Sequence, residues 1–295
     1  MFAPERVHVQ TNFIGDLNTM PEEIVEKMPT GIASLDPILD GGVPPGSVIL
    51  LLGDTGGGNY EYVYSSVVNL LQQKALKARP NNALLPVEID YITFTRLEKD
   101  VTSEVKHSFQ LDDIGTLLES IRFRDLSEQY FDASIVPDDW YSHSDIKTRL
   151  QKRSGYENIL VQLSRVINDI PTGSLIVLDS VTDIATQLAS SDHWRDLTGF
   201  LRGLQRISKQ KKITTYLLLS REILESFREK EIADIVDAVM LFKWEETTGA
   251  RRQRVMYIEK FRGVMPHLEE RDLVKFAVRI TPAGGFEVSN IRMII

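Results

Sequence analysis

Residues 47–60 hold the feature that most constrains the fold of this chain: an apolar strand, a glycine-rich turn and a helix in direct succession. Residues 48–52 are all apolar and lie between two glycines, which is typical of a buried parallel strand. From residue 60 apolar side chains recur at helical spacing, so we expect a helix over residues 60–77. This order points backbone N–H groups and the positive end of a helix at one place, which favours an anion there.

The turn has the frame of a phosphate-binding loop but lacks its two reactive side chains. In the pattern G-x-x-x-x-G-K-[ST], the Lys reaches the β- and γ-phosphates and the hydroxyl holds Mg²⁺. Here Asn59 stands at the Lys position and Tyr60 at the hydroxyl position. The candidate nucleotide-binding residues form a degenerate loop: Gly53, Asp54, Thr55, Gly56, Gly57, Gly58, Asn59 and Tyr60. A glycine-rich turn that binds nothing is the alternative.

A second candidate element is an apolar strand that ends in an acid. Residues 175–178 are apolar and Asp179 follows them, which predicts a carboxylate at the carboxyl end of the sheet, where ligands bind in open α/β folds. In NTPases such an Asp holds Mg²⁺ and its water shell. Asp179 is therefore the candidate metal residue of the nucleotide site. Capping of a helix that begins near Val181 is the alternative role.

Length and composition favour one large α/β domain. The 295 residues are 42% hydrophobic, and we expect an N-terminal segment over residues 1–28, which packs on a neighbouring subunit as well as on its own core, followed by a single domain over residues 29–295. The net charge of −8 argues against a general nucleic-acid binder. With no cysteine and no run long enough to span a membrane, we expect a cytoplasmic protein without membrane partners.

Strands alternate with helices along the chain, which predicts a mostly parallel sheet with helices on its faces. We expect parallel strands at residues 48–52, 89–94, 120–124, 175–178, 214–219 and 238–243. Antiparallel strands are expected at residues 255–258, 274–280 and 286–288. Helices are expected at residues 60–77, 102–110, 146–169 and 194–211. Residues 128–144 lack a regular pattern and are interpreted as a surface insertion.

The stretch before the loop resembles the one that precedes the phosphate loop in KaiC-type and RadA-type members of the RecA superfamily. It reads TGIASLDPILDGGVPPGS over residues 30–47. Further similar runs are YITF at 91–94, LLSRE at 218–222, IADIVDAV at 232–239 and the K-x-R-G element at 260–263. The resemblance covers roughly residues 28–290 and is to a single-domain KaiC-like protein of the archaeal kind. It implies a RecA-like P-loop NTPase core.

The resemblance implies ATP or ADP with Mg²⁺ as ligands, but this chain lacks residues that the family uses. The acidic pair that follows the second strand, one member of which activates water, corresponds here to Thr95 and Arg96. Neither side chain can act as a general base near neutral pH, and Glu98 is displaced from this position. The loop region also carries Asp54 and Glu61 without a cation in the same stretch. We therefore expect weak or absent ATP binding and no catalytic residue.

Lys260 and Arg262 match the K-x-R-G element, whose two cations reach a neighbouring subunit's γ-phosphate in the family. The alternative is that both cations are exposed on an edge strand and prevent it from pairing with other strands. The resemblance together with the replaced residues predicts a pseudo-ATPase that acts as a regulatory or scaffold subunit. Its expected setting is a homo-oligomer or a mixed ring with a KaiC-like ATPase, with a signalling or DNA-associated partner. The alternatives are an ATPase that uses Glu98 or Asp179 as its base, and a sensor that binds ADP or AMP without turnover.

Two further clusters of charged residues are interpreted as solvent-exposed surface and not as binding sites. His143 lies close in sequence to Asp138, Asp139 and Asp145, a spacing that suits a metal, but a solvated polar loop is preferred. The basic run at residues 251–254 is interpreted as a charged hairpin tip, and a surface facing a ring's central pore is the alternative.

Overall fold

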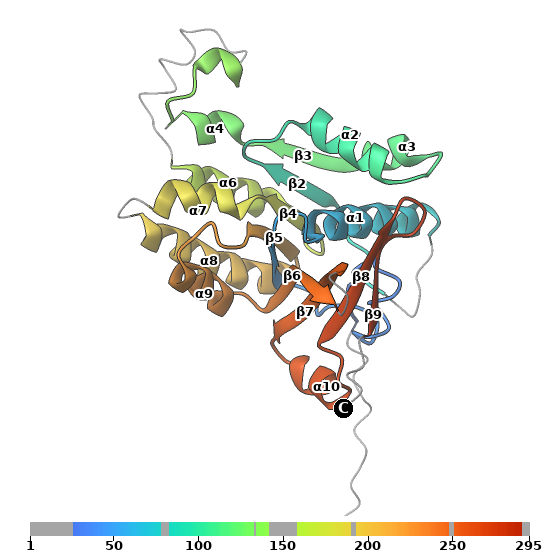
Figure 1. The fold of residues 1–295 in the computed structure, drawn as a ribbon. Coiled ribbons are helices and arrows are strands. Elements are labelled where there is room, and N and C mark those ends of the chain that lie inside the picture. Colours follow the sequence, from blue (N-terminus) through green and yellow to red (C-terminus); the bar gives the residue numbers. More distant parts are fainter. Residues whose placement is uncertain are drawn as a thin grey trace, which may run out of the picture.

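A single mixed sheet organises the part of the chain that the computed structural model describes, which is residues 26–77, 83–132, 134–141, 158–189, 193–247 and 251–290. The sheet has nine strands in the order β3-β2-β4-β5-β1-β6-β7-β8-β9 (Figure 1). The strands from β3 to β6 in this order are parallel, and β7, β8 and β9 are antiparallel. This arrangement confirms the predicted RecA-like α/β class with antiparallel strands at the C-terminal side.

The strands are β1 (Val48–Gly53), β2 (Ile89–Thr93), β3 (Ile121–Asp125), β4 (Leu175–Asp179), β5 (Thr214–Ser220), β6 (Ala238–Thr247), β7 (Arg251–Phe261), β8 (Lys275–Thr281) and β9 (Gly285–Asn290). The α-helices are α1 (Asn59–Ala75), α2 (Glu98–Ser108), α3 (Ile114–Leu118), α4 (Ser127–Phe131), α6 (Ile159–Asp169), α7 (Val181–Ala189), α8 (Trp194–Lys211), α9 (Ser226–Ile235) and α10 (Met265–Glu270). A short 3₁₀ helix covers Asp138–Trp140.

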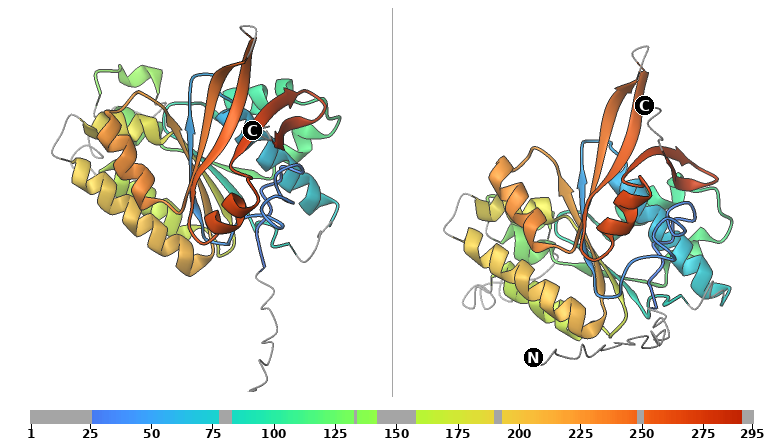
Figure 2. Two further views of the ribbon diagram at one scale, coloured as in Figure 1. Left: turned by 60° about the horizontal axis from the view of Figure 1, so that its bottom comes forward. Right: turned by 90° about the horizontal axis from the view of Figure 1, so that it is seen from below.

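Helices cover both faces of the parallel strands, so each strand must be apolar on both sides. Ile49 and Leu51 of β1 face a core shared with α1, α2 and α3. Val48 and Leu50 face the opposite core, which contains residues of α6, α7, α8 and α9. Figures 1 and 2 show these two helical layers on either side of the sheet. The continuous apolar runs of the sequence are explained by this double burial.

Most predicted strands agree with the observed ones within two residues, but those predicted at 238–243 and 255–258 are longer in the structure, as β6 and β7. The helix predicted at residues 194–211 has the observed bounds of α8. The helix predicted at 102–110 begins earlier, at Glu98. Of the helix predicted at 146–169, residues 146–157 lie outside the described part, and α6 begins at Ile159. The irregular stretch after β3 contains α4 and the 3₁₀ helix, and its Trp140 is exposed.

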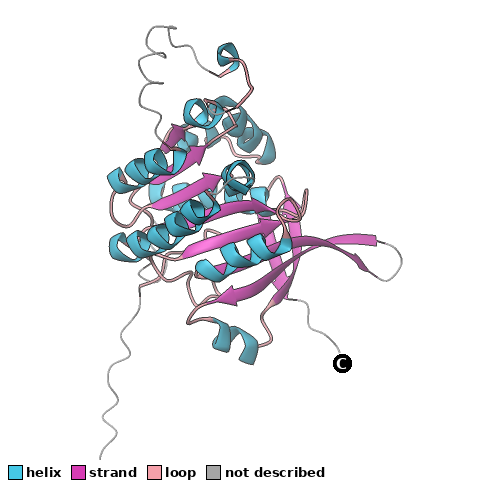
Figure 3. Ribbon diagram, turned by 90° about the vertical axis from the view of Figure 1, so that its left-hand side faces the viewer, coloured by secondary structure: helices cyan, strands magenta, loops and turns pink. Residues whose placement is uncertain are grey.

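Beyond the parallel strands, β6 and β7 continue as a two-stranded ribbon. β6 pairs with β1 only as far as Phe242, and β7 pairs with β8 only through residues 255–257. Residues 243–247 and 251–254 therefore pair across the ribbon alone, and the ribbon projects from the body of the molecule (Figures 2 and 3). Within the described residues, every helix is too short or too polar to cross a membrane.

Candidate nucleotide site

The glycine-rich loop connects β1 to α1 as the sequence predicts, and glycine conformations shape its backbone. Gly58 precedes the helix with a φ of 112°, a conformation that favours glycine. The N–H of Gly57 donates to the carbonyl of Asp54 at 2.8 Å, which closes the turn. Among the described residues, no acceptor binds the N–H groups of Thr55, Gly56 or Gly58. The cradle of N–H donors is therefore still present.

Asn59 takes the Lys position but its side chain is folded into the loop. The residue is buried, and its amide lies so close to Gly53 that a Cβ on the glycine would come within 2.5 Å of Asn59 Cγ. The amide carries no charge. Asn59 thus fills space beneath the loop and cannot replace the family's Lys as a partner for a γ-phosphate.

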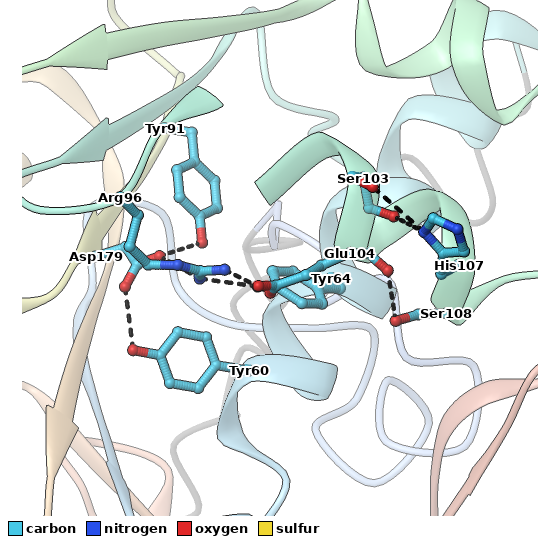
Figure 4. Close-up of polar contacts among 9 residues, drawn as sticks. All are labelled: Tyr60, Tyr64, Tyr91, Arg96, Ser103, Glu104, His107, Ser108 and Asp179. Carbon is cyan, nitrogen blue, oxygen red and sulfur yellow. Dashed lines mark hydrogen bonds and ion pairs between the residues drawn. The ribbon is translucent and has the colours of Figure 1, made fainter. Parts of the chain in front are cut away.

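Asp179 lies at the end of β4 and is the centre of a buried polar network (Figure 4). Its side chain is 1% exposed. The Tyr60 hydroxyl donates to Oδ1 at 3.1 Å, and the Tyr91 hydroxyl donates to Oδ2 at 2.8 Å. Arg96 donates to Oδ2 from Nη1 at 3.0 Å. Both carboxylate oxygens therefore have donors from the protein itself.

Arg96 links this carboxylate to a second one. Its Nη2 forms an ion pair with Glu104, and its Nη1 also donates to the Tyr64 hydroxyl at 3.0 Å. Tyr64 in turn donates to Glu104 at 2.8 Å. The guanidinium also lies over the ring of Tyr60, 5.5 Å from its centroid. Arg96 is thus held by Asp179, Glu104 and two tyrosines, and its contacts fix its orientation.

The protonation states follow from burial and pairing. Burial raises the pKa of Asp179, and Arg96 with the hydroxyls of Tyr91 and Tyr60 acts against that rise. Burial lowers the pKa of Arg96, but the charge of Asp179 and the bonds to Tyr64 and Glu104 outweigh it, so the net pKa is raised. Burial also raises the pKa of Tyr60. Arg96 is therefore a permanent cation and Tyr60 a permanent hydroxyl donor.

The family model described as "ATPase: KaiC" matches residues 91–290, which is more than half of the chain. The chain belongs to the KaiC ATPase family. The crystal structure of KaiC-like protein PH0186 from the hyperthermophilic archaeon Pyrococcus horikoshii OT3 has a similar fold, with a TM-score of 0.57 and 19% identity over 90% of this chain and 99% of that one. No curated protein matches the chain by sequence.

In this KaiC-family chain, the residues at the site do not fit Mg²⁺. A hydroxyl ligand is replaced by Tyr60, whose oxygen is bonded to Asp179, and Arg96 places a cation where the metal would have to approach that carboxylate. Among the described residues, no group of three acidic, His or Cys side chains could hold a metal. His143 and Asp145 lie outside the described part.

The structure also tests the other predicted positions near the loop. Thr95 is exposed, and its hydroxyl lies 3.4 Å from Asp183 Oδ2. Glu98 is exposed at the start of α2, and no contact brings it to Asp179. The oxygens of Asp179 are engaged by the network described above, and at the start of α7 the Ser180 hydroxyl donates to Asp183 at 3.0 Å. Neither Thr95 nor Glu98 belongs to the buried network.

Asp54, which has no cation in its own stretch of sequence, is paired in the structure. Arg221, just after β5, forms an ion pair with Asp54 at 3.0 Å. Arg254 of the ribbon donates from Nε to the carbonyl of Gly56 at 2.9 Å and lies 4.4 Å from the ring of Trp244. The cations that serve the loop come from distant parts of the chain, which is why the local sequence did not reveal them.

Lys260 and Arg262 lie away from the loop of their own chain. Lys260 pairs with Val239 at the amino end of β6, whereas the loop adjoins Phe242 further along that strand. Lys260 Nζ donates to the carbonyls of Ala233 and Asp234 at 2.8 and 2.7 Å, and Arg262 donates to that of Asp234 at 2.8 Å. In the isolated chain both cations stabilise the carboxyl end of α9.

Proposed function

We propose that this KaiC-family chain is a pseudo-ATPase that acts as a regulatory or scaffold subunit. The observation that carries the proposal is the saturated carboxylate of Asp179, which accepts hydrogen bonds from Tyr60, Tyr91 and Arg96 while almost fully buried. A metal ion would have to displace these donors and face the charge of Arg96. The bonds of Asp179 therefore suit a structural role for this carboxylate better than a role in ATP hydrolysis.

Hydrolysis also requires a base, and none of the described residues at the site is placed to act as one. The positions of the family's acidic pair hold Thr95 and Arg96, and Glu104, the acid nearest to Arg96, is engaged by that guanidinium and by Tyr64. Burial raises the pKa of Glu104, but the bonds from Arg96 and Tyr64 outweigh it and lower the pKa below the usual value. A carboxylate held in this way is a poor proton acceptor.

The partners follow from the family and remain part of the proposal. We propose a homo-oligomer or a mixed ring with a KaiC-like ATPase, in which Lys260 and Arg262 of this chain face the nucleotide of the neighbour. A signalling or DNA-associated protein is the proposed client of such a scaffold. Light scattering with and without nucleotide tests association, and a monomer at high concentration contradicts it.

The main test combines calorimetry with phosphate release. The wild-type protein should bind Mg-ATP weakly or not at all and release phosphate no faster than buffer. Asn59→Lys with Tyr60→Thr and Arg96→Glu restores the cation, the hydroxyl and an acid, and should bind Mg-ATP. The matched control is Arg124→Glu. It makes the same Arg-to-Glu change as Arg96→Glu, but in the ion pair between Arg124 of β3 and Asp90 of β2. Wild-type turnover that disappears in Asp179→Ala would show an active ATPase.

A nucleotide sensor is the second candidate, because the N–H groups of Thr55, Gly56 and Gly58 lack acceptors among the described residues. Such a site would take ADP or AMP without Mg²⁺, through the loop backbone alone. Titration of ADP and AMP with EDTA present separates this function from a pure scaffold. Affinity that is unchanged by EDTA supports the sensor.

A further inference from the structure

The outer side of α8 is hollowed on both flanks, and the two hollows differ in chemistry. One, of about 230 Å³, lies between α6 and α8 and is lined mainly by Ile167, Phe200, Leu204 and Ile207. The other, of about 630 Å³, is lined by Arg202, Arg206 and Lys209 of α8 together with Arg262. Gly203 lines both. An apolar surface and a cationic surface therefore meet at one residue.

The cationic hollow has an excess of unpaired positive charge. Asp237 is its only lining carboxylate, and it already accepts from the Val48 N–H at 2.9 Å, from Gln205 at 3.0 Å and from Lys209 at 3.1 Å. Among the described residues no carboxylate forms an ion pair with Arg202, Arg206 or Arg262. Arg202 and Arg206 are four residues apart on one helix, where like charges repel. On a chain of net charge −8 this patch favours an acidic occupant.

We propose that residues 1–25 of the same chain bind across α8, with apolar side chains in the first hollow and carboxylates at the second. This segment has the matching composition. Its apolar residues include Phe13, Ile14 and Leu17, and its carboxylates Glu5, Asp16, Glu22 and Glu23 outnumber its single cation, Arg6. Burial of the apolar residues supplies affinity, and the charges set the position.

The described chain begins close to this surface. Met28 forms an isolated bridge with Val43, and Gly46 lies so close to α8 that a Cβ on it would come within 2.6 Å of the Ser208 carbonyl. Val43 and Gly46 are three steps apart along the chain, a span of at most about 11 Å. The segment therefore starts near the Lys209 end of the cationic hollow, and its tether keeps its effective concentration high.

Binding of the segment has a consequence for partners. Arg262 lines the cationic hollow, so the bound segment covers a cation that the pseudo-ATPase proposal assigns to a neighbouring subunit. The segment then acts as an internal competitor for that surface. The docking itself does not depend on the pseudo-ATPase role, and the experiment below involves no nucleotide.

The absence of cysteine from the sequence permits a direct test by disulfide cross-linking. Asn18→Cys places a thiol next to Leu17, and Gly203→Cys places one between the hollows, where a Cβ meets no atom within 4 Å. With a mild oxidant, these two cysteines should form a disulfide within one chain. The cross-linked monomer should migrate faster on a non-reducing gel, and no dimer should appear. The matched control is Asn18→Cys with Glu119→Cys, an exposed residue just after α3 on the opposite face.

The charge contribution is tested in the same background. Arg202→Glu with Arg206→Glu should slow the cross-link by about tenfold or more, as should a rise from 0.05 to about 1 M salt. Lys99→Glu with Lys106→Glu makes the same change on α2 and should leave the rate unchanged. Adding Glu22→Arg with Glu23→Arg should restore the rate in the reversed variant.

Three outcomes would overturn the proposal. Equal cross-linking to residues 203 and 119 would mean that the segment has no preferred position. Cross-linked dimers in place of monomers would assign the surface to the segment of a second copy. A cross-linking rate that does not change with salt concentration would contradict the electrostatic argument, even if the variant with Arg202→Glu and Arg206→Glu failed to fold.

Discussion

The hydroxyl of Tyr60 donates to Oδ1 of Asp179 at 3.1 Å and so joins the first turn of α1 directly to the end of β4. In P-loop NTPases the side chains at these two positions meet through a hydrated Mg²⁺ ion. The longer phenol spans that gap without an ion, and Arg96 supplies the positive charge. The replacements at the site are therefore complementary to one another.

Arg96→Ala should lower the free energy of unfolding by about 3–5 kcal/mol, because it leaves the buried carboxylate of Asp179 without its counter-ion. Chemical denaturation measures the change. Arg122→Ala is the matched control: it breaks an ion pair with Glu88 that is largely exposed on the arginine side, and should cost at most about 1 kcal/mol. Adding Asp179→Asn to Arg96→Ala should recover much of the loss. No recovery would mean that Arg96 acts by packing alone.

Stability should fall as the pH is lowered from about 4.5 toward 2, in part because of Glu245 on the ribbon. Burial opposes its ionisation, but bonds from Lys275, Tyr257 and Lys243 lower its pKa from 4.5 to about 2. A carboxyl with a lowered folded-state pKa stabilises the fold above its unfolded-state pKa and loses that contribution as it is protonated. Glu245→Gln should therefore flatten the pH dependence in this window.

Urea unfolding at a series of pH values, followed by tryptophan fluorescence, measures that slope. Lys275→Met removes a partner 2.8 Å from Glu245 and should flatten the slope in the same direction. An unchanged slope in both variants would contradict the assignment to Glu245.

Lys260→Ala with Arg262→Ala should reduce stability by about 1–3 kcal/mol, because it removes cation hydrogen bonds to the carbonyls of Ala233 and Asp234 at the end of α9. If the pair also acts in trans, wild-type protein should stimulate a KaiC-like ATPase with an intact loop and the double variant should not. Lys230→Ala, an exposed cation on α9, is the control. Equal stimulation by the wild type, the double variant and Lys230→Ala would mean that Lys260 and Arg262 only stabilise α9.

Glycine substitutions should have opposite signs at two positions. Gly58→Ala should destabilise the protein by about 1–2 kcal/mol, because φ is 112° there and L side chains avoid that region. Gly203→Ala, inside α8 with open space around it, should stabilise by about 0.5–1 kcal/mol. Thermal or urea denaturation of the two variants measures the contrast. Equal effects would mean that the loop backbone relaxes around Gly58.

The sheet was predictable because its strands are short apolar runs that must be buried on both faces, as residues 48–52 and 175–178 illustrate. α8 was predictable because its length gives a clear apolar stripe. By contrast, α3, α4 and α10 have five, five and six residues, too few for a periodic signal. Such short helices depend on their neighbours for stability.

At the candidate site, the sequence singled out the loop, Asp179 and positions 59, 60, 95 and 96, but not how their side chains pair. Arg96 was interpreted only as a missing acid, whereas the structure shows it as the partner of a carboxylate 83 residues away. Asp54 and Arg221 are 167 residues apart, so no local pattern connects them. One signal was available: an acid changed to a cation in the same chain that lost the loop's Lys suggests that one charge replaced another.

The Arg96–Asp179 pair also limits how this chain can evolve. Any single substitution that frees Asp179 for a metal, at Arg96 or at Tyr60, first breaks a bond to a buried carboxylate and should therefore lower stability. Under the same proposal, a Lys introduced at residue 59 would gain no activity while Arg96 remains. Under the pseudo-ATPase proposal, a gain of catalysis would need several changes together, because the effect of each substitution depends on the others.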